Sequence, residues 1–375
     1  MKHYKFLLFA LVLILALISY VSCRGWQVLT LINSTVGRKS YLITCILLTF
    51  CLFLGMFFEN NLPISLARSF LFLGYSFLFL VMYLFFSFLL VDLFRGLNHF
   101  QHIISGQGMM ALRFWTMMVS LVLIIVLMIA GNIKFNHPAV VNLYLKSNKP
   151  IQNKEIKIVA ASDFHLGTSI GKKQLQKYVK LINAHHPDLV LMVGDICDHS
   201  LPAMVRQNLK EDLQKIQAPL GVYAVDGNHE YYSFHLAEVN EYYKSAGIKV
   251  LRDGTAEIQH QFYLVGRDDY NNRQRKKLSE LMDSFDPSKP VIVIDHQPMS
   301  LEESQQENID LHLSGHTHNG QVFPGNLLAK RFFEVSYGYK KKGNTHIYVS
   351  SGLGLWGPPY RIGTQSELVV IHFQY

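Results

Sequence analysis

Four long apolar stretches in the first third of the chain constrain its fold more than any other feature. Each stretch lacks Asp, Glu, Lys and Arg, and each is bounded on both sides by charged residues. A helix needs about 20 predominantly apolar residues to cross the hydrocarbon core of a bilayer. We therefore predict four membrane-spanning helices, at about residues 6–23, 40–58, 69–91 and 114–133.

The first stretch leaves an alternative open. Lys2 and Lys5 precede a short apolar core, and small residues lie near Ser22 and Cys23, which is also the pattern of a signal peptide. The three later stretches hold the chain in the membrane in either case. Lys and Arg are almost equally frequent in the loops on the two sides, so the charges do not set the orientation. We expect a multi-pass protein of the cell membrane, with the side of the remaining chain undetermined.

The composition changes after the fourth stretch. The chain of 375 residues is 50% hydrophobic on average, but that average joins an apolar region to a segment in which short apolar runs alternate with polar turns. We predict a transmembrane region over residues 1–135, a linker over 136–154 and a folded domain over 155–375. The net charge of +8 is modest, and the basic runs at 273–277 and 340–342 are short, so no nucleic-acid-binding patch is indicated.

The folded domain begins with strands that alternate with helices and continues mostly with strands. Helices are predicted at 172–184, 202–216 and 236–245. This order favours an α/β sandwich with mixed sheets. The predicted strands cover residues 156–162, 188–193, 221–225, 262–265, 291–294, 311–313, 347–349 and 368–372.

Five of these strands end in side chains that bind metal ions. Open α/β sheets place their sites at the carboxyl ends of the strands. A single Asp-x-His pair is weak evidence for a metal site, because most such pairs are ordinary turn residues. Five such groups in series are a specific signal. The groups are Asp163-Phe164-His165, Gly194 to Asp198, Gly227-Asn228-His229-Glu230, Asp295-His296, and Gly315-His316-Thr317-His318.

This series, D-x-H, G-D-x-x-D, G-N-H-E, a later His and G-H-x-H, resembles the calcineurin-like metallophosphoesterase superfamily over about residues 156–375. With its apolar N-terminal region, the whole chain is similar to transmembrane proteins that carry a metallophosphoesterase domain. The resemblance implies a four-layer α/β sandwich with two mixed β-sheets. It also implies an enzyme that hydrolyses phosphate esters with the help of metal ions.

The resemblance implies two divalent metal ions and assigns their ligands. It places Asp163, His165 and His318 on one ion, and Asn228, His296 and His316 on the other. Asp195 is expected to bridge the two ions, whose mutual repulsion a shared carboxylate offsets. Oxygen and nitrogen ligands without thiolate suit Mn²⁺, Fe²⁺ or Zn²⁺.

The resemblance also implies catalytic roles. His229 is expected to protonate the leaving group, and Asp198 to fix the tautomer of that imidazole. His199, Asn319 and Arg361 are expected to contact substrate. In the protein serine/threonine phosphatase branch an Arg follows the second Asp of the G-D-x-x-D motif, whereas His199 stands there in this chain, which favours a phosphodiester or a pyrophosphate over a phosphoprotein.

The resemblance and the membrane region together imply a membrane-anchored, two-metal phosphohydrolase that cleaves phosphodiester or pyrophosphate bonds in lipid-linked or nucleotide-linked substrates beside the lipid bilayer. Related enzymes cleave UDP-2,3-diacylglucosamine in lipid A synthesis. Two other interpretations are a broad-specificity phosphodiesterase of the cell envelope and a catalytically silent membrane scaffold. A silent relative would be expected to lack a ligand, and this sequence contains all seven.

Overall fold

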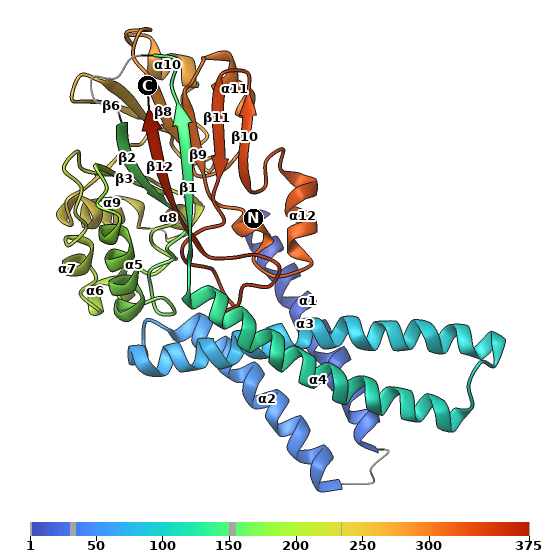
Figure 1. The fold of residues 1–375 in the computed structure, drawn as a ribbon. Coiled ribbons are helices and arrows are strands. Elements are labelled where there is room, and N and C mark those ends of the chain that lie inside the picture. The colour runs from blue at the N-terminus through green and yellow to red at the C-terminus, as the bar shows by residue number, and fades with distance from the viewer. Residues whose placement is uncertain (1, 31–34, 150–154, 234, 375) are drawn as a thin grey trace. The chain divides into compact units, whose positions relative to one another are not determined.

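The computed structural model describes residues 2–30, 35–149, 155–233 and 235–374. The chain separates into two compact units (Figure 1). The helical unit comprises Met1–Ala130 with Gly357–Pro359, and the sheet unit comprises Gly131–Trp356 with Tyr360–Tyr375. The fold class predicted from the sequence, membrane helices followed by an α/β sandwich with two mixed sheets, is confirmed.

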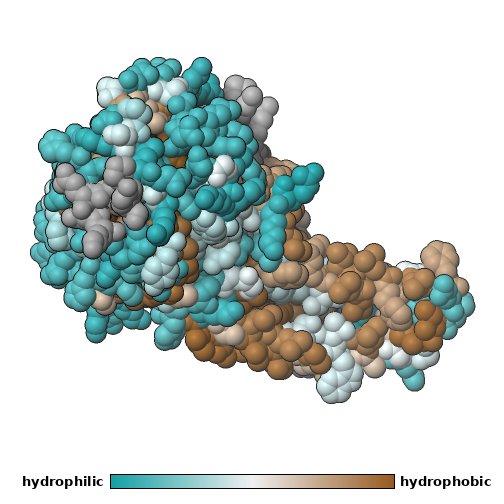
Figure 2. Space-filling model, turned by 45° about the horizontal axis from the view of Figure 1, so that its top comes forward, coloured by the Kyte–Doolittle hydropathy of each residue, from teal (hydrophilic) through white to brown (hydrophobic). Residues whose placement is uncertain are grey.

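Four helices form the first part of the chain. They are α1 (Lys2–Thr30), α2 (Thr35–Phe58), α3 (Ile64–Gln101) and α4 (Gly106–Asn136). All four are long and apolar enough to cross a membrane. Apolar side chains cover much of the visible surface of the helical unit, in contrast to the mostly polar surface of the sheet unit (Figure 2). Such a surface suits contact with lipid, because lipid tails solvate apolar side chains.

A small residue allows two of these helices to pack closely. A side chain on Gly74 of α3 would collide with the backbone of Leu52 in α2, so the two helices touch there through main-chain atoms. Close approach at small residues is a common way for helices to associate within a bilayer. The last residues of α4, from Gly131 onward, belong to the sheet unit.

The first sheet contains six strands, in the order β1-β12-β2-β3-β4-β5. Neighbouring strands are parallel except for β12 and β2, which are antiparallel. The strands are β1 (Ala139–Lys146), β12 (Glu367–Gln374), β2 (Glu155–Ala161), β3 (Leu189–Val193), β4 (Val222–Val225) and β5 (Ile248–Val250).

The second sheet also contains six strands, in the order β10-β11-β9-β8-β7-β6. Its outer pairs, β10 with β11 and β6 with β7, are antiparallel, and the inner pairs are parallel. The strands are β10 (Gly338–Lys342), β11 (Thr345–Val349), β9 (Leu311–Ser314), β8 (Val291–Ile294), β7 (Phe262–Gly266) and β6 (Gly254–Ile258).

The two sheets pack face to face through an apolar core, to which β2, β3, β8 and β9 all contribute buried side chains. Helices cover the outer face of each sheet, which gives four layers. The first sheet is covered by α5 (Lys172–Ala184), α6 (Leu201–Arg206), α7 (Lys210–Leu213) and α9 (Leu236–Ser245). The second is covered by α10 (Leu278–Met282) and α11 (Leu301–Gln306). The short elements α8 (Asn228–Tyr232), η1 (His318–Gly320) and α12 (Gly325–Phe332) complete the unit.

Two local expectations differ from the structure. The segment 136–154 was expected to be a linker, but β1 lies inside it and pairs with β12 along its whole length. Its alternating, half-exposed pattern is that of an edge strand, which acquires its partner only from the end of the chain. The helix expected over 202–216 is broken into α6 and α7, because Asn208 adopts a left-handed backbone conformation with φ of 53°.

Candidate metal centre

The seven predicted metal ligands lie in the first residues that follow β2, β3, β4, β8 and β9, whereas Arg361 lies in the segment before β12. Main-chain hydrogen bonds join these loops across the strands. The N–H of Asp163 donates to Gly194 O at 3.0 Å, and the N–H of Gly315 donates to His296 O at 2.9 Å. The sheets thus hold five separate segments of the chain at one edge.

Left-handed backbone conformations are concentrated in these loops. Non-glycine residues rarely adopt positive φ, and when they do the cost is of order 1–3 kcal/mol each, which the surrounding structure must offset. Such residues are most often found at functional sites. Five of the seven predicted metal ligands have this conformation: Asp163, His165, Asp195, His316 and His318, with φ of 56°, 48°, 51°, 69° and 48°.

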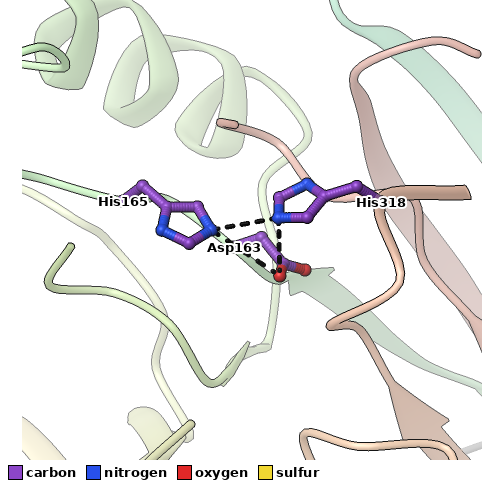
Figure 3. Close-up of side chains that lie close together, drawn as sticks. All are labelled: Asp163, His165 and His318. Carbon is purple, nitrogen blue, oxygen red and sulfur yellow. Dashed lines mark hydrogen bonds and ion pairs between the residues drawn. The ribbon is translucent and has the colours of Figure 1, made fainter. Parts of the chain in front are cut away.

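One group consists of Asp163, His165 and His318 (Figure 3). Nε2 of His318 lies 3.4 Å from Oδ1 of Asp163, and Nε2 of His165 lies 3.9 Å from the same oxygen. The two imidazoles face each other through their Nε2 atoms at 3.1 Å. All three side chains are buried. Three ligand atoms therefore converge on one point.

A second group consists of Asp195, His296 and His316. Oδ2 of Asp195 lies 3.0 Å from Nε2 of His296. Asn228 joins this group, because its Oδ1 lies 2.8 Å from Nδ1 of His316. The four residues are those that the resemblance placed on the second ion, together with the expected bridge.

Asp195 also lies beside the first group. Its Oδ2 is 3.9 Å from Nε2 of His165, and Asp195, His165 and His229 form a third set of converging ligand atoms. Burial raises the pKa of Asp195, but the neighbouring imidazoles, foremost that of His296, outweigh burial and hold the pKa well below its usual range. The carboxylate is thus charged and lies between the two groups.

The protonation of His296 tests whether these residues fit a metal ion. Its Nδ1 lies 2.8 Å from Val193 O, so that nitrogen carries the hydrogen and donates it to the carbonyl. Nε2 is buried and faces the Asp195 carboxylate, so it either carries a proton or offers its lone pair to a metal ion. Two acceptors at this distance repel each other unless a cation, either a proton or a metal ion, binds between them. The residues fit a metal ion.

The neighbouring cysteine is not among the ligand atoms. Cys197 is fully buried, and burial raises the pKa of its thiol well above the ordinary value. Four imidazoles, two carboxylates and one amide make up the seven converging side chains. This mixture of nitrogen and oxygen donors suits a transition-metal ion better than Mg²⁺ or Ca²⁺, which prefer oxygen ligands.

The two residues expected to act in catalysis lie together beside the cluster. Nδ1 of His229 lies 2.7 Å from Asp198 O and 3.1 Å from its Oδ1, so Nδ1 donates to Asp198. Burial lowers the pKa of His229, but the carboxylates of Asp195 and Asp198 outweigh it and raise the pKa to about 9. Oδ1 of Asp198 also lies 3.3 Å from Nδ1 of His165.

Comparison with known proteins agrees with this geometry. The family model described as calcineurin-like phosphoesterase matches residues 156–320. A metallophosphoesterase of Aquifex aeolicus, named as uncharacterized, is 32% identical over 60% of this chain and 88% of its own length. The chain belongs to the calcineurin-like metallophosphoesterase family. Family members use divalent metal ions, and the clusters described above supply candidate ligands for them.

The names of two relatives refer to a transmembrane region. Proteins called transmembrane protein with metallophosphoesterase domain are 31% identical in Danio rerio and 30% identical in Bos taurus, over 62% and 63% of this chain. The chain spans 57% of the length of each. Together with the four apolar helices, this makes the metallophosphoesterase described here a multi-pass membrane protein.

The three residues expected to contact substrate occupy different surroundings. His199 is 41% exposed, and its Nδ1 lies 2.9 Å from Oδ2 of Asp198. Asn319 lies between His318 and Gly320 in η1 with a left-handed backbone, and its N–H donates to Thr317 Oγ1 at 3.1 Å. Arg361 is fully buried, and its guanidinium donates to the carbonyls of His318, Gly352 and Gly354.

The structure places Arg361 beneath the metal loop. Its side chain is 0% exposed and its guanidinium donates to the main-chain carbonyl of His318, so the role in substrate contact stays a prediction. Burial lowers the pKa of Arg361 to about 10, which still leaves the side chain charged at neutral pH.

Sequence reasoning also assigned no role to Glu230, which is fully buried behind Asp195. Its position as the last residue of the G-N-H-E motif could have indicated a structural role. An acid that is buried inside a site must accept hydrogen bonds from several donors. Two exposed aromatic rings border the site as well. The rings of Tyr232 and Trp356 lie 5.6 Å and 6.2 Å from that of His229.

Proposed function

We propose that this chain is a membrane-anchored phosphohydrolase that uses two divalent metal ions, Mn²⁺, Fe²⁺ or Zn²⁺, to cleave phosphodiester or pyrophosphate bonds. The observation that carries the proposal is the position of the Asp195 carboxylate, beside His296 and His316 on one side and within 3.9 Å of His165 on the other. A carboxylate so placed is what two neighbouring cations require.

The proposed ligands of the first ion are Asp163, His165 and His318. Those of the second ion are Asn228, His296 and His316, and Asp195 is shared. When bound, the ions neutralise charge on the phosphoryl oxygens and lower the pKa of the attacking water. The chain itself contributes the orientation of every ligand, since the sheets and the main-chain hydrogen bonds between loops fix the backbone.

His229 is the proposed general acid. With Nδ1 bonded to Asp198, its Nε2 would hold the proton that passes to the departing oxygen. Asp198 orients His229 and His165 at once, so it couples the proton donor to a proposed metal ligand. This arrangement supports in-line displacement with protonation of a poor leaving group.

The proposed substrate class is a diester or pyrophosphate linked to a lipid or a nucleotide. Two observations favour it over a phosphoprotein. His199 stands where the protein phosphatase branch has an Arg that binds the phosphate. The guanidinium of Arg361 donates its hydrogen bonds to main-chain carbonyls. The multi-pass anchor favours a substrate that resides in the bilayer, of the type of UDP-2,3-diacylglucosamine.

The test uses the full-length chain in nanodiscs. We expect about two bound metal ions per chain, and hydrolysis of bis(p-nitrophenyl) phosphate that Asp195→Asn lowers by at least about a thousandfold, because the ions lose their shared ligand. Asp286→Asn is the matched control, since the Asp286 carboxylate accepts hydrogen bonds from Ser288 in an exposed turn. A wild-type chain that binds metal but hydrolyses neither diesters nor pyrophosphates would contradict the proposal and favour a scaffold.

Substrate class is tested separately. We expect kcat/KM for a lipid-linked pyrophosphate to exceed that for the corresponding soluble nucleotide sugar in the same nanodiscs. Equal values would favour a broad-specificity phosphodiesterase instead.

A further inference from the structure

Helix α12, which follows the last proposed metal ligand by seven residues, presents an unusual surface. Leu327, Leu328 and Phe332 are 55%, 60% and 76% exposed, and Ala329 is its buried residue. At 100° per residue the three exposed side chains fall within an arc of about 140°. Single exposed apolar residues are normal in soluble domains, but three on a helix of eight residues form a patch.

Basic residues accompany this patch. Lys330 and Arg331 lie in the last turn of α12. The nearest acid along the chain, Glu334, is already engaged by Lys340 and Lys342, each at 2.9 Å. A short helix that combines exposed Leu and Phe with Lys and Arg has the composition of a segment that lies in the interface of an anionic bilayer.

The start of α12 is tied to the end of a membrane-spanning helix, entirely within the sheet unit. The N–H of Phe323 donates to Ile362 O at 2.9 Å, and the N–H of Arg361 donates to Gly131 O at 3.1 Å. A side chain on Gly131 would meet Tyr360 Cβ at 3.2 Å, so this segment lies directly against the backbone of α4.

Gly131 lies near the predicted end of the fourth membrane-spanning stretch. It lies in the apolar stretch that ends before Lys134, three residues further on, which is about 5 Å along a helix. The side-chain amide of Gln365 donates to Lys134 O and His137 O and so closes the end of α4. The segment 360–365, which leads towards α12, is therefore hydrogen-bonded to the last residues of α4 within the sheet unit.

We propose that the Leu327, Leu328 and Phe332 face of α12 inserts into the surface of the bilayer, with Lys330 and Arg331 bound to anionic phospholipid headgroups. The occupant is the membrane to which the chain is already anchored. Two observations support this choice: the basic charge of the patch and its hydrogen-bonded connection to Gly131, near the predicted end of a membrane-spanning helix.

Insertion of α12 would also fix the position of the metal centre relative to the lipid. The backbones of Gly320 and Gly325 touch, since a side chain on Gly320 would collide with Gly325, and Gly320 has φ of +75°, which other residues rarely adopt. The N–H of Gly325 donates to Val322 O at 2.7 Å. The loop with His316 and His318 is thus joined to α12 by a connection that leaves little freedom.

The test measures contact with lipid rather than activity, so its result is independent of the proposed hydrolysis. In full-length chain carrying Cys23→Ser and Cys51→Ser, a polarity-sensitive fluorophore is attached through Leu328→Cys or, as control, through His260→Cys. His260 is 87% exposed in the turn between β6 and β7. Each labelled chain is placed in nanodiscs with brominated phosphatidylglycerol, at one chain per disc.

We expect the label at position 328 to be quenched by brominated lipid at least about threefold more than the label at 260, and its emission to shift to the blue. Lys330→Gln with Arg331→Gln is expected to reduce the difference, as is high salt. Equal quenching at the two positions, with free access of iodide to both, would overturn the proposal. A label at 328 that is shielded from iodide but not quenched by lipid would also overturn it, in favour of a protein partner.

Discussion

The carboxylate of Glu230 accepts a hydrogen bond from the backbone N–H of Asp195 at 3.1 Å. It also accepts from the N–H groups of Gly227 at 2.7 Å and Cys197 at 2.8 Å, and from the Tyr243 hydroxyl at 2.8 Å. One buried side chain therefore joins the loop that carries Asp195 to the loop that carries Asn228. We therefore expect the spacing of the two proposed metal sites to depend on this acid.

Replacing Glu230 tests that dependence. In Glu230→Gln an amide NH₂ group replaces one carboxylate oxygen and faces N–H donors. Buried donors are then left without an acceptor, which lowers the free energy of unfolding by about 2–3 kcal/mol. We expect a lower Tm and metal affinity reduced by about tenfold or more, measured by calorimetry on the detergent-solubilised chain. Glu302→Gln, at an exposed side chain paired with Lys342, is expected to change neither quantity measurably. Unchanged metal affinity in Glu230→Gln would show that the two loops are held independently.

Substrates with different leaving groups can show whether His229 acts as a general acid or has only a structural role. An activated leaving group such as p-nitrophenolate departs without a proton, whereas an alkoxide needs one. We expect His229→Asn to lower kcat on an alkyl phosphodiester by about a hundredfold or more, and to affect the p-nitrophenyl ester at least about tenfold less. The same loss on both esters would exclude the acid role.

Arg361 is expected to act on the metal loop and not on substrate. Lys in its place has one donor nitrogen and cannot reach the carbonyls of His318, Gly352 and Gly354 together. We therefore expect Arg361→Lys to lower metal content and Tm, while the metal-loaded fraction keeps its KM. Arg273→Lys, at an exposed position, serves as the control. A raised KM with full metal content would restore the role in substrate contact.

Acid is expected to destabilise the sheet unit through His312 in β9. Its ring lies between Ser304 Oγ at 2.7 Å and Ser314 Oγ at 3.0 Å. Burial, with the nearby Arg267 and Arg275, lowers the pKa of His312 to about 3. Below its ordinary pKa of 6.5 the unfolded chain takes up a proton that the folded chain excludes, so stability falls as the pH drops from about 6.5 towards 3.

The measurement compares wild type with His312→Gln at pH 7.5 and pH 5.0, in excess chelator so that metal binding does not enter. We expect the loss of unfolding free energy between these pH values to be larger in wild type by about 2 kcal/mol, because one pKa unit corresponds to about 1.4 kcal/mol. An identical loss in the two chains would assign the acid sensitivity to other groups.

The sequence by itself determined the class of the molecule. A bilayer requires about 20 apolar residues for each crossing, so four spanning helices can be read directly from local composition. The strand ends could also be read, because Asp163, Asp195, Asn228, His296 and His316 follow apolar runs within three residues. Parallel strands bring such ends to one edge of a sheet, and the structure brings these side chains together.

Only the tertiary structure decided the placement of segments whose partners are distant in the chain. The β1 strand is weakly apolar and exists as a strand through its pairing with β12, more than 200 residues away. Arg361 follows a proline-rich turn, a sequence context typical of an exposed loop. In the structure it is buried against the carbonyls of three other residues. Such placements follow from packing between segments that meet only in the folded chain, and no local pattern of residues encodes them.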